Sequence, residues 1–105
     1  MIVVLFRSRL TGEAGEDYVA MDAHMAERAR NAPGFVDVKA YTAADGERLT
    51  VVRWRDLETL RQWREDPEHR VAQATGWARW YEFYEMEVAE VVRESHFARA
   101  AAVEA

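Results

Sequence analysis

The residues most suited to binding or chemistry in this chain are aromatic and hydrogen-bonding side chains in its second half. Trp63 lies on the apolar side of a predicted helix, so its indole should point into the interior. A buried indole N–H normally needs a polar partner, which favours a site with polar groups nearby. Gln73 and Trp77 share one helical face, with His69 one turn before Gln73. This spacing predicts a row of functional side chains along one helix.

A pocket formed by these residues would suit a flat, apolar ligand. Ser8 is the one hydroxyl late on the apolar side of the first predicted strand, where it could supply a polar contact. Apolar walls with a few convergent polar groups are typical of small-molecule sites. The alternative interpretation is that the aromatic residues simply fill a small core. The predicted lining consists of Phe6, Ser8, Trp54, Trp63, His69, Gln73, Trp77 and Tyr84.

His69 is the histidine best placed for acid–base chemistry or ligand contact. His24 lies off the apolar stripe of its helix, and His96 lies in the polar C-terminal segment. The alternative is that His69 occupies an exposed position near the start of a helix. No two histidines stand at metal-binding spacing and the chain has no cysteine, so no metal site is expected. Nucleophile-elbow, phosphate-loop and dinucleotide motifs are also missing, and no cofactor is expected.

Composition and charge exclude several other classes of function. The formal net charge of −5 gives no general basic footprint for nucleic acid. No apolar run approaches the roughly 20 residues that span a membrane, so no membrane partner is expected. The N-terminal run is broken by Arg7 and Arg9 and lacks the pattern of a signal peptide. These features predict a cytoplasmic protein.

The hydrophobic pattern predicts one α+β domain, which suits a chain of 105 residues. Alternation and helical periodicity follow in the order strand, helix, strand, strand, helix, strand, the β-α-β-β-α-β pattern of ferredoxin-like folds. Pro33-Gly34 ends the first helix, Asp45-Gly46 favours a hairpin turn, and Asp66-Pro67 begins the last helical piece. Right-handed crossovers should place both helical layers on one face of an antiparallel sheet. The expected strands are residues 2–10, 35–42, 48–55 and 80–92, and the expected helices are residues 16–32 and, in two pieces, 57–75.

The two faces of the predicted sheet differ in character. One face is strongly apolar and should meet the helices; it carries Ile2, Val4, Phe6, Val36, Val38, Ala40, Val52, Trp54, Tyr84, Met86 and Val88. The opposite face mixes charged with large apolar residues; it carries Arg7, Arg9, Asp37, Lys39, Arg53, Arg55, Glu85, Glu87, Val3, Leu5, Phe35, Tyr41, Leu49, Val51 and Phe83. Its interleaved acids would weaken any attraction for phosphates. Such a face suits pairing with a second copy of the chain, and a solvent-exposed face with incidental aromatics is the alternative.

Several segments resemble the antibiotic biosynthesis monooxygenase family of small α+β proteins. They are Asn-Ala-Pro-Gly-Phe at 31–35, Trp-Arg-Asp-Leu-Glu-Thr-Leu at 54–60 leading into Trp63, Asp-Pro-Glu-His at 66–69 and Trp-Tyr-Glu at 80–82. The resemblance covers residues 1–92 and leaves residues 93–105 as a C-terminal tail or short helix. It implies a ferredoxin-like subunit that pairs sheet to sheet in a dimeric α+β barrel, with a pocket between sheet and helices.

The resemblance implies one of two chemistries. Some members oxygenate aromatic compounds without metal or flavin, and others degrade haem with an asparagine, a tryptophan and a histidine. Trp63 matches the tryptophan of both branches. Arg9-Leu10-Thr11 places Ser8 at the position of the haem-branch asparagine, and Gln73 stands at the position of its histidine, ten residues after the tryptophan. Two of the three haem residues are replaced, which disfavours haem degradation.

The leading hypothesis is a cofactor-independent monooxygenase that oxidises a small phenolic or quinone-like compound. Trp63 would form a pocket wall, His69 would assist proton removal, and Ser8 and Gln73 would orient oxygen atoms of the substrate. The alternative is a ligand-binding or stress-response dimeric barrel without turnover, and a haem-binding protein ranks third. The expected partners are a second copy of the chain and a small aromatic ligand.

Overall fold

The computed structural model describes residues 1–99, apart from the side chain of Trp77. The chain forms one α+β unit in the ferredoxin-like order expected from its periodicity, and the predicted fold class is confirmed. The elements are β1 (Ile2–Leu10), α1 (Glu16–Arg30), β2 (Phe35–Thr42), β3 (Arg48–Trp54), α2 (Leu57–Arg64), α3 (Pro67–Thr75), the short π-helix η1 (Gly76–Trp80) and β4 (Tyr81–Glu90).

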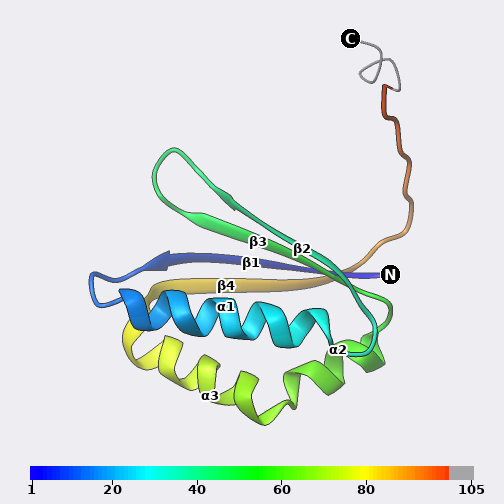
Figure 1. The fold of residues 1–105 in the computed structure, drawn as a ribbon. Helices are drawn as coiled ribbons and strands as arrows, with labels where there is room; N and C mark the ends of the chain where they lie inside the picture. The colour runs from blue at the N-terminus through cyan, green and yellow to red at the C-terminus, as the bar shows by residue number, and fades with distance from the viewer. Residues whose placement is uncertain (100–105) are drawn as a thin grey trace.

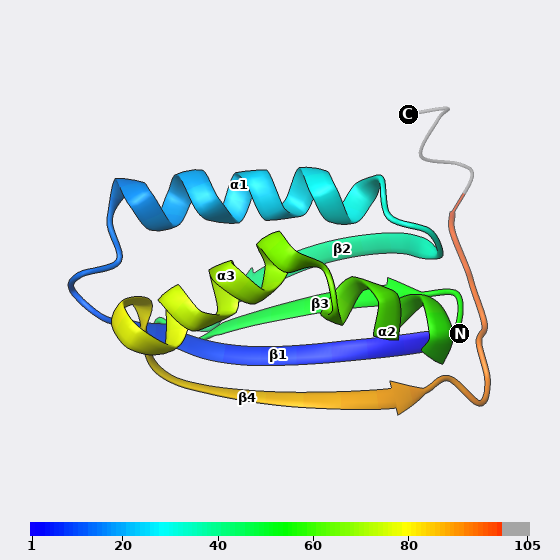
Figure 2. The same ribbon diagram turned by 90° about the horizontal axis from the view of Figure 1, so that it is seen from below.

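The four strands form one antiparallel sheet in the order β2-β3-β1-β4. All the helices lie on one face of this sheet, as the right-handed crossovers predicted, and no helix within residues 1–99 covers the opposite face (Figure 1). Seen from below, α1 and the α2–α3 segment lie side by side across the sheet (Figure 2). Within residues 1–99, no helix has the length and apolar character to cross a membrane.

Two aspartates determine where the later helices begin. The Asp56 carboxylate accepts the backbone N–H of Thr59 at 2.8 Å and caps α2. The Asp66 carboxylate accepts the backbone N–H groups of Glu68 and His69 at 3.0 and 3.1 Å and caps α3. Each cap satisfies donors that the first helical turn leaves unpaired. The second cap also fixes the turn that carries His69.

Gly34 makes the turn from α1 into β2 possible. Its φ of 81° lies in the left-handed region, which favours glycine. A Cβ at this position would also collide with the Thr59 side chain at the start of α2. The turn, the end of β3 and the start of α2 can therefore pack together only around a glycine.

The core lies between the sheet and the helices, at the end where β3 leads into α2. Ile2, Val4, Trp54 and Leu60 form a buried cluster. Trp54 is 1% exposed, and its ring meets Phe35 edge to face at a centroid distance of 5.7 Å. Burial of these large apolar surfaces is the main source of stability at this end of the sheet.

The predicted faces of the sheet hold except at the start of β2. The pairing with β3 contains a bulge, because Phe35 lies opposite Trp54 while Asp37 lies opposite Arg53. The extra residue, Val36, is 43% exposed, and Phe35 packs on the helix side. Strict alternation had assigned these two residues to the wrong faces, since a bulge shifts the alternation by one position.

The helical region continues beyond the position predicted from the sequence. Gly76 does not interrupt it: the backbone continues as η1, and β4 begins at Tyr81. Packing overrides the low helix propensity of glycine, since Gly76 and Trp80 are both buried. The strand predicted to span residues 80–92 is thus shorter at both ends. Residues 91–99 have no regular structure, and the rest of the predicted tail lies outside the described residues.

Candidate active site

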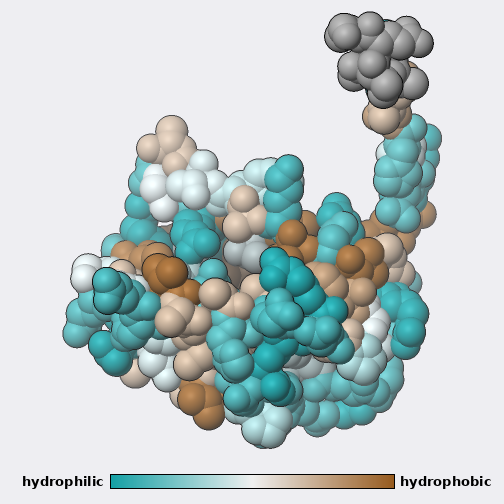
Figure 3. Space-filling view, viewed as in Figure 1, coloured by the Kyte–Doolittle hydropathy of each residue, from teal (hydrophilic) through white to brown (hydrophobic). Residues whose placement is uncertain are grey.

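A cavity of about 710 Å³ lies between the helix-facing side of the sheet and the helices. Strand residues of β1, β3 and β4 line one side of it, and residues of α1, α2 and α3 line the other. Hydrophobic residues gather at mid-height of the molecule, between the helices below and the sheet above (Figure 3). The volume is typical of a site for a small organic molecule.

The structure brings together seven of the eight residues that the sequence analysis selected. The seven in the cavity wall are Phe6, Ser8, Trp54, Trp63, His69, Gln73 and Tyr84. The eighth is Trp77, whose side chain lies outside the described part of the chain. The alternative of a completely filled core does not fit a space of this size.

Three aromatic rings form a stack at one end of the cavity. Trp63 lies against Trp54 with ring centroids 5.9 Å apart and an angle of 28° between the planes. Trp63 also stacks against His69, with ring centroids 4.6 Å apart and an angle of 23° between the planes. Trp63 is therefore held between the core of the domain and the histidine, which fixes the orientation of both rings.

The hydrogen bonding of His69 determines which of its nitrogens can accept a proton. Its Nδ1 lies 3.2 Å from the backbone carbonyl oxygen of Trp63. A carbonyl oxygen only accepts, so this contact assigns the proton to Nδ1 and the lone pair to Nε2. Burial lowers the pKa of His69, against smaller opposing effects of the Trp63 carbonyl and the Asp66 charge. The ring is consequently neutral at pH 7, with Nε2 available as a base.

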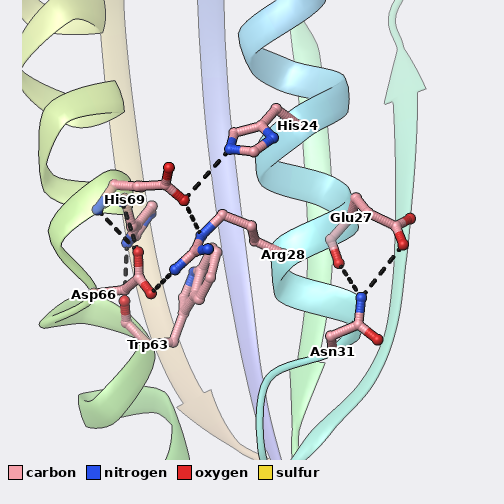
Figure 4. A network of polar contacts seen from close by, with 8 residues as sticks. His24, Glu27, Arg28, Asn31, Trp63, Asp66 and His69 are labelled. Carbon is pink, nitrogen blue, oxygen red and sulfur yellow. Dashed lines mark hydrogen bonds and ion pairs between the residues drawn. The ribbon is translucent and has the colours of Figure 1, made fainter.

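An ion pair between α1 and α3 supports the turn that carries His69 (Figure 4). Arg28 Nη2 donates to Asp66 Oδ2 at 2.5 Å, and its Nε lies 2.6 Å from Glu68 Oε2 without the alignment of a hydrogen bond. Arg28 holds the pKa of the Asp66 carboxyl below its usual range. His24 lies 3.4 Å from Glu68 on the exposed side of this network. The Asp66 cap is thus braced from a second helix.

A smaller cavity of about 390 Å³ adjoins the same tryptophan. Its lining includes charged and polar residues of α1 and the α2–α3 segment, among them Arg28, Asn31, Gln62 and Asp66. Trp63 is the one described residue that lines both cavities, so its ring lies between them. The larger space contains seven of the residues predicted from the sequence as a pocket lining.

The sequence analysis missed a polar group at the other end of the large cavity. Arg48 Nη1 donates to Tyr18 Oη at 2.5 Å, and its guanidinium lies 5.7 Å from the centroid of the same ring. Tyr81 completes the group; its ring packs so closely on Gly76 that a Cβ there would lie 2.6 Å from it. Arg48 pairs with Ser8 across β1 and β3. The alternation along β3 was a usable signal, since Arg48 has the same parity as Trp54.

The structure is thus that of a ferredoxin-like subunit with a cavity between its sheet and its helices. The chain belongs to the antibiotic biosynthesis monooxygenase family, whose family model matches residues 1–75. The membership agrees with the resemblance seen in the sequence motifs.

Individual relatives support this assignment. The chain is 34% identical to the uncharacterized protein YqjZ of Bacillus subtilis over 94 residues, which cover 90% of this chain and 82% of the relative. It shares its fold with a candidate antibiotic biosynthesis monooxygenase from Deinococcus radiodurans, with a TM-score of 0.80 at 13% identity, covering 94% of this chain and 100% of the other. The fold is also similar to that of SnoaB, a cofactor-independent oxygenase from Streptomyces nogalater, with a TM-score of 0.74 at 16% identity. This similarity covers 89% of this chain and 94% of SnoaB.

Proposed function

We propose that this protein is a cofactor-independent monooxygenase that oxidises a small phenolic compound in the cavity between sheet and helices. The observation that carries the proposal is His69, a neutral base that lines an aromatic cavity beside Trp63. The similarity in fold to SnoaB, described as a cofactor-independent oxygenase, also supports it.

The proposed reaction begins with proton removal by His69. Its Nε2 takes the phenolic proton, and the resulting anion is electron-rich enough to react directly with O₂. A C–O bond forms at the ring carbon para to the oxygen, giving a hydroperoxide. Loss of the ring hydrogen and cleavage of the O–O bond then release water and leave a quinone. The balance is one phenol and one O₂ to one quinone and one water.

The remaining cavity residues are assigned to binding and orientation. Trp63 forms a flat wall against which an aromatic ring can stack. Phe6 and Tyr84 are themselves stacked, with ring centroids 5.4 Å apart, and present a second apolar surface. Ser8 and Gln73 provide hydrogen-bonding groups for substrate oxygens.

We also propose that two copies pair through the open face of the sheet to form a dimeric α+β barrel. Arg7 makes ion pairs of 2.5 and 2.9 Å with Glu47 and Glu85, and Arg53 pairs with Asp37 at 3.3 Å. The charges of this face are therefore largely balanced within one chain. Its half-buried apolar residues would supply the association; they are Val3, Leu5, Leu49, Val51 and Phe83. The cytoplasmic location and the assignment of residues 93–105 as a tail stay predictions.

Oxygen uptake with a panel of dihydroxy-aromatic compounds tests the enzymatic proposal. We expect His69→Ala to lower kcat by about 10²-fold or more, as loss of a general base usually does. Trp63→Phe keeps an aromatic wall but removes the larger ring, and we expect a smaller loss. His24→Ala is the matched control, because His24 is an exposed histidine of α1 outside the large cavity.

Three results would contradict the proposal in different ways. Oxygen uptake by no member of the panel, with binding retained, would favour the ligand-binding barrel without turnover. Equal activity of wild type and His69→Ala would remove His69 as the base. A Soret shift on addition of hemin that disappears in His69→Ala would favour haem binding through this histidine.

A further inference from the structure

Arg48 is a half-buried arginine without an acidic partner, whereas Arg64 and Arg70, which also line the cavity without an ion pair, are exposed. The other half-buried arginines are each paired: Arg9 with Asp45, Arg28 with Asp66, and Arg53 with Asp37. Within residues 1–99, no carboxylate oxygen lies within 4.0 Å of the Arg48 guanidinium. A partly desolvated cation without a counter-charge is costly, and such a cation facing a cavity is suited to an anionic ligand.

The groups around Arg48 present hydrogen-bond donors to the cavity. Tyr18 Oη accepts a hydrogen bond from Arg48, so its own O–H can still donate. Burial, together with the Asp22 charge in the same wall, raises the pKa of Tyr18 and of Tyr81 and keeps both protonated. The Arg48 guanidinium has further N–H groups beyond the one it gives to Tyr18. This end of the cavity therefore has a surplus of donors.

This donor group lies at the opposite end of the cavity from the aromatic stack. Arg48 is the first residue of β3 and Trp54 is the last, so their Cα atoms are about 20 Å apart along an extended strand. Trp54 lies against Trp63, which in turn contacts His69. Arg48 and His69 line the same cavity, so a ligand held at Arg48 extends from there toward His69.

We propose that the substrate is an aromatic carboxylic acid, whose carboxylate binds to Arg48 and Tyr18 while its phenolic group faces His69. The planar fork of a guanidinium can donate to both oxygens of a carboxylate at once. A phenolate has a single oxygen and cannot form this pair of bonds. The inference rests on the proposed function for the role of His69. The Arg48 subsite itself depends only on binding.

Calorimetric titration without oxygen, at pH 7.5, tests the subsite separately from turnover. The probes are 6-hydroxy-2-naphthoate and its neutral analogue 6-hydroxy-2-naphthamide, which differ only in the carboxylate. We expect the wild type to bind the acid at least about tenfold more tightly than the amide, as charge-assisted pairing predicts. Arg48→Met should bring this ratio close to one, chiefly by weakening binding of the acid.

Two further variants keep the test decisive. Arg48→Lys retains the charge but not the fork, so we expect an intermediate preference for the acid. Arg30→Met is the control, because Arg30 is an exposed arginine of α1 that does not line the cavity, and it should keep the wild-type ratio. Equal binding of acid and amide by the wild type would overturn the inference, even if Arg48→Met failed to fold. Preference for the acid, with no oxygen uptake from any compound of the dihydroxy-aromatic panel, would instead contradict the enzymatic proposal alone.

Discussion

The two faces of the same four-stranded sheet handle charge in opposite ways. On the open face, arginines and carboxylates pair with each other, as Arg7 of β1 does with Glu85 of β4 and with Glu47 just before β3. On the helix-covered face the polar groups are few, and the arginine among them, Arg48, contacts a tyrosine hydroxyl instead of an acid. The charges of the open face thus neutralise one another within the chain, whereas the arginine of the covered face lines the cavity without an acidic partner.

This difference shows how to distinguish a structural surface from a binding site. Exposed ion pairs contribute little to stability, so the paired charges of the open face add little to the free energy of folding. A half-buried donor without an acidic partner needs another explanation. The same reasoning applies to His69, whose Nδ1 is engaged by the Trp63 carbonyl while Nε2 has no partner among the described residues.

The largest expected effect comes from removing the central ring of the covered face. Trp54→Ala should lower the free energy of unfolding by about 3–5 kcal/mol, because it deletes a fully buried indole that Phe35 and Trp63 contact. Tyr41→Ala, on the open face and 48% exposed in one chain, should lower it by less than Trp54→Ala does, because less of its ring is removed from solvent. Urea unfolding measures both. Similar losses in the two variants would show that the faces do not differ as described.

A charge at the centre of the open face tests its role in pairing. Val51 of β3 lies opposite Leu5 of β1. The substitution Val51→Glu would bury an unpaired carboxylate between the two copies, and it should raise the dimer dissociation constant by about 100-fold. Light scattering should then show a shift from twice 12.1 kDa toward 12.1 kDa. Val19→Glu, at a position 65% exposed on α1, is the control and should leave the mass unchanged. A monomeric wild type would contradict the pairing proposal directly.

A smaller effect is expected from the cap of α3. Asp66→Ala removes the acceptor for two backbone N–H groups and should cost about 1 kcal/mol of stability. It also removes a charge that raises the pKa of His69, so that pKa should fall further, as NMR titration would show. Asp56→Ala removes the cap of α2 in the same way. An equal shift of the His69 pKa in both variants would contradict the specific link between Asp66 and His69.

The smallest expected effect is a dependence of stability on pH. Burial lowers the pKa of His69 in the folded state below its ordinary value of 6.5. At a pH between the folded-state pKa and 6.5, the unfolded chain therefore binds more protons than the folded chain. Stability should therefore be fully present above pH 6.5 and decrease as the pH falls toward the pKa of the folded state. Urea unfolding from pH 7.5 to 5.5 should show a smaller decrease for His69→Gln than for wild type. Exposed His24 provides the control, and His24→Gln should keep the wild-type decrease.

Much of the fold could be predicted because the relevant signals are local. Alternation, helical periodicity and the Asp-Gly turn gave the strand and helix order, and Asp56 and Asp66 cap helices as their positions indicate. The bulge at Val36 was not predictable, since its residue types suit a regular strand equally well. The continuation through Gly76 was missed because tertiary packing, and not helix propensity, holds η1 together.

The sequence by itself determined the fold class, the apolar face and the selection of Trp63 and His69, because residue type and spacing fix which side chains share one face of an element. Only the tertiary structure placed Arg48 of β3 against Tyr18 of α1, thirty residues earlier in the chain. It also decided which nitrogen of His69 contacts the Trp63 carbonyl and which keeps its lone pair. These contacts join separate elements, and their geometry depends on how the helices pack on the sheet.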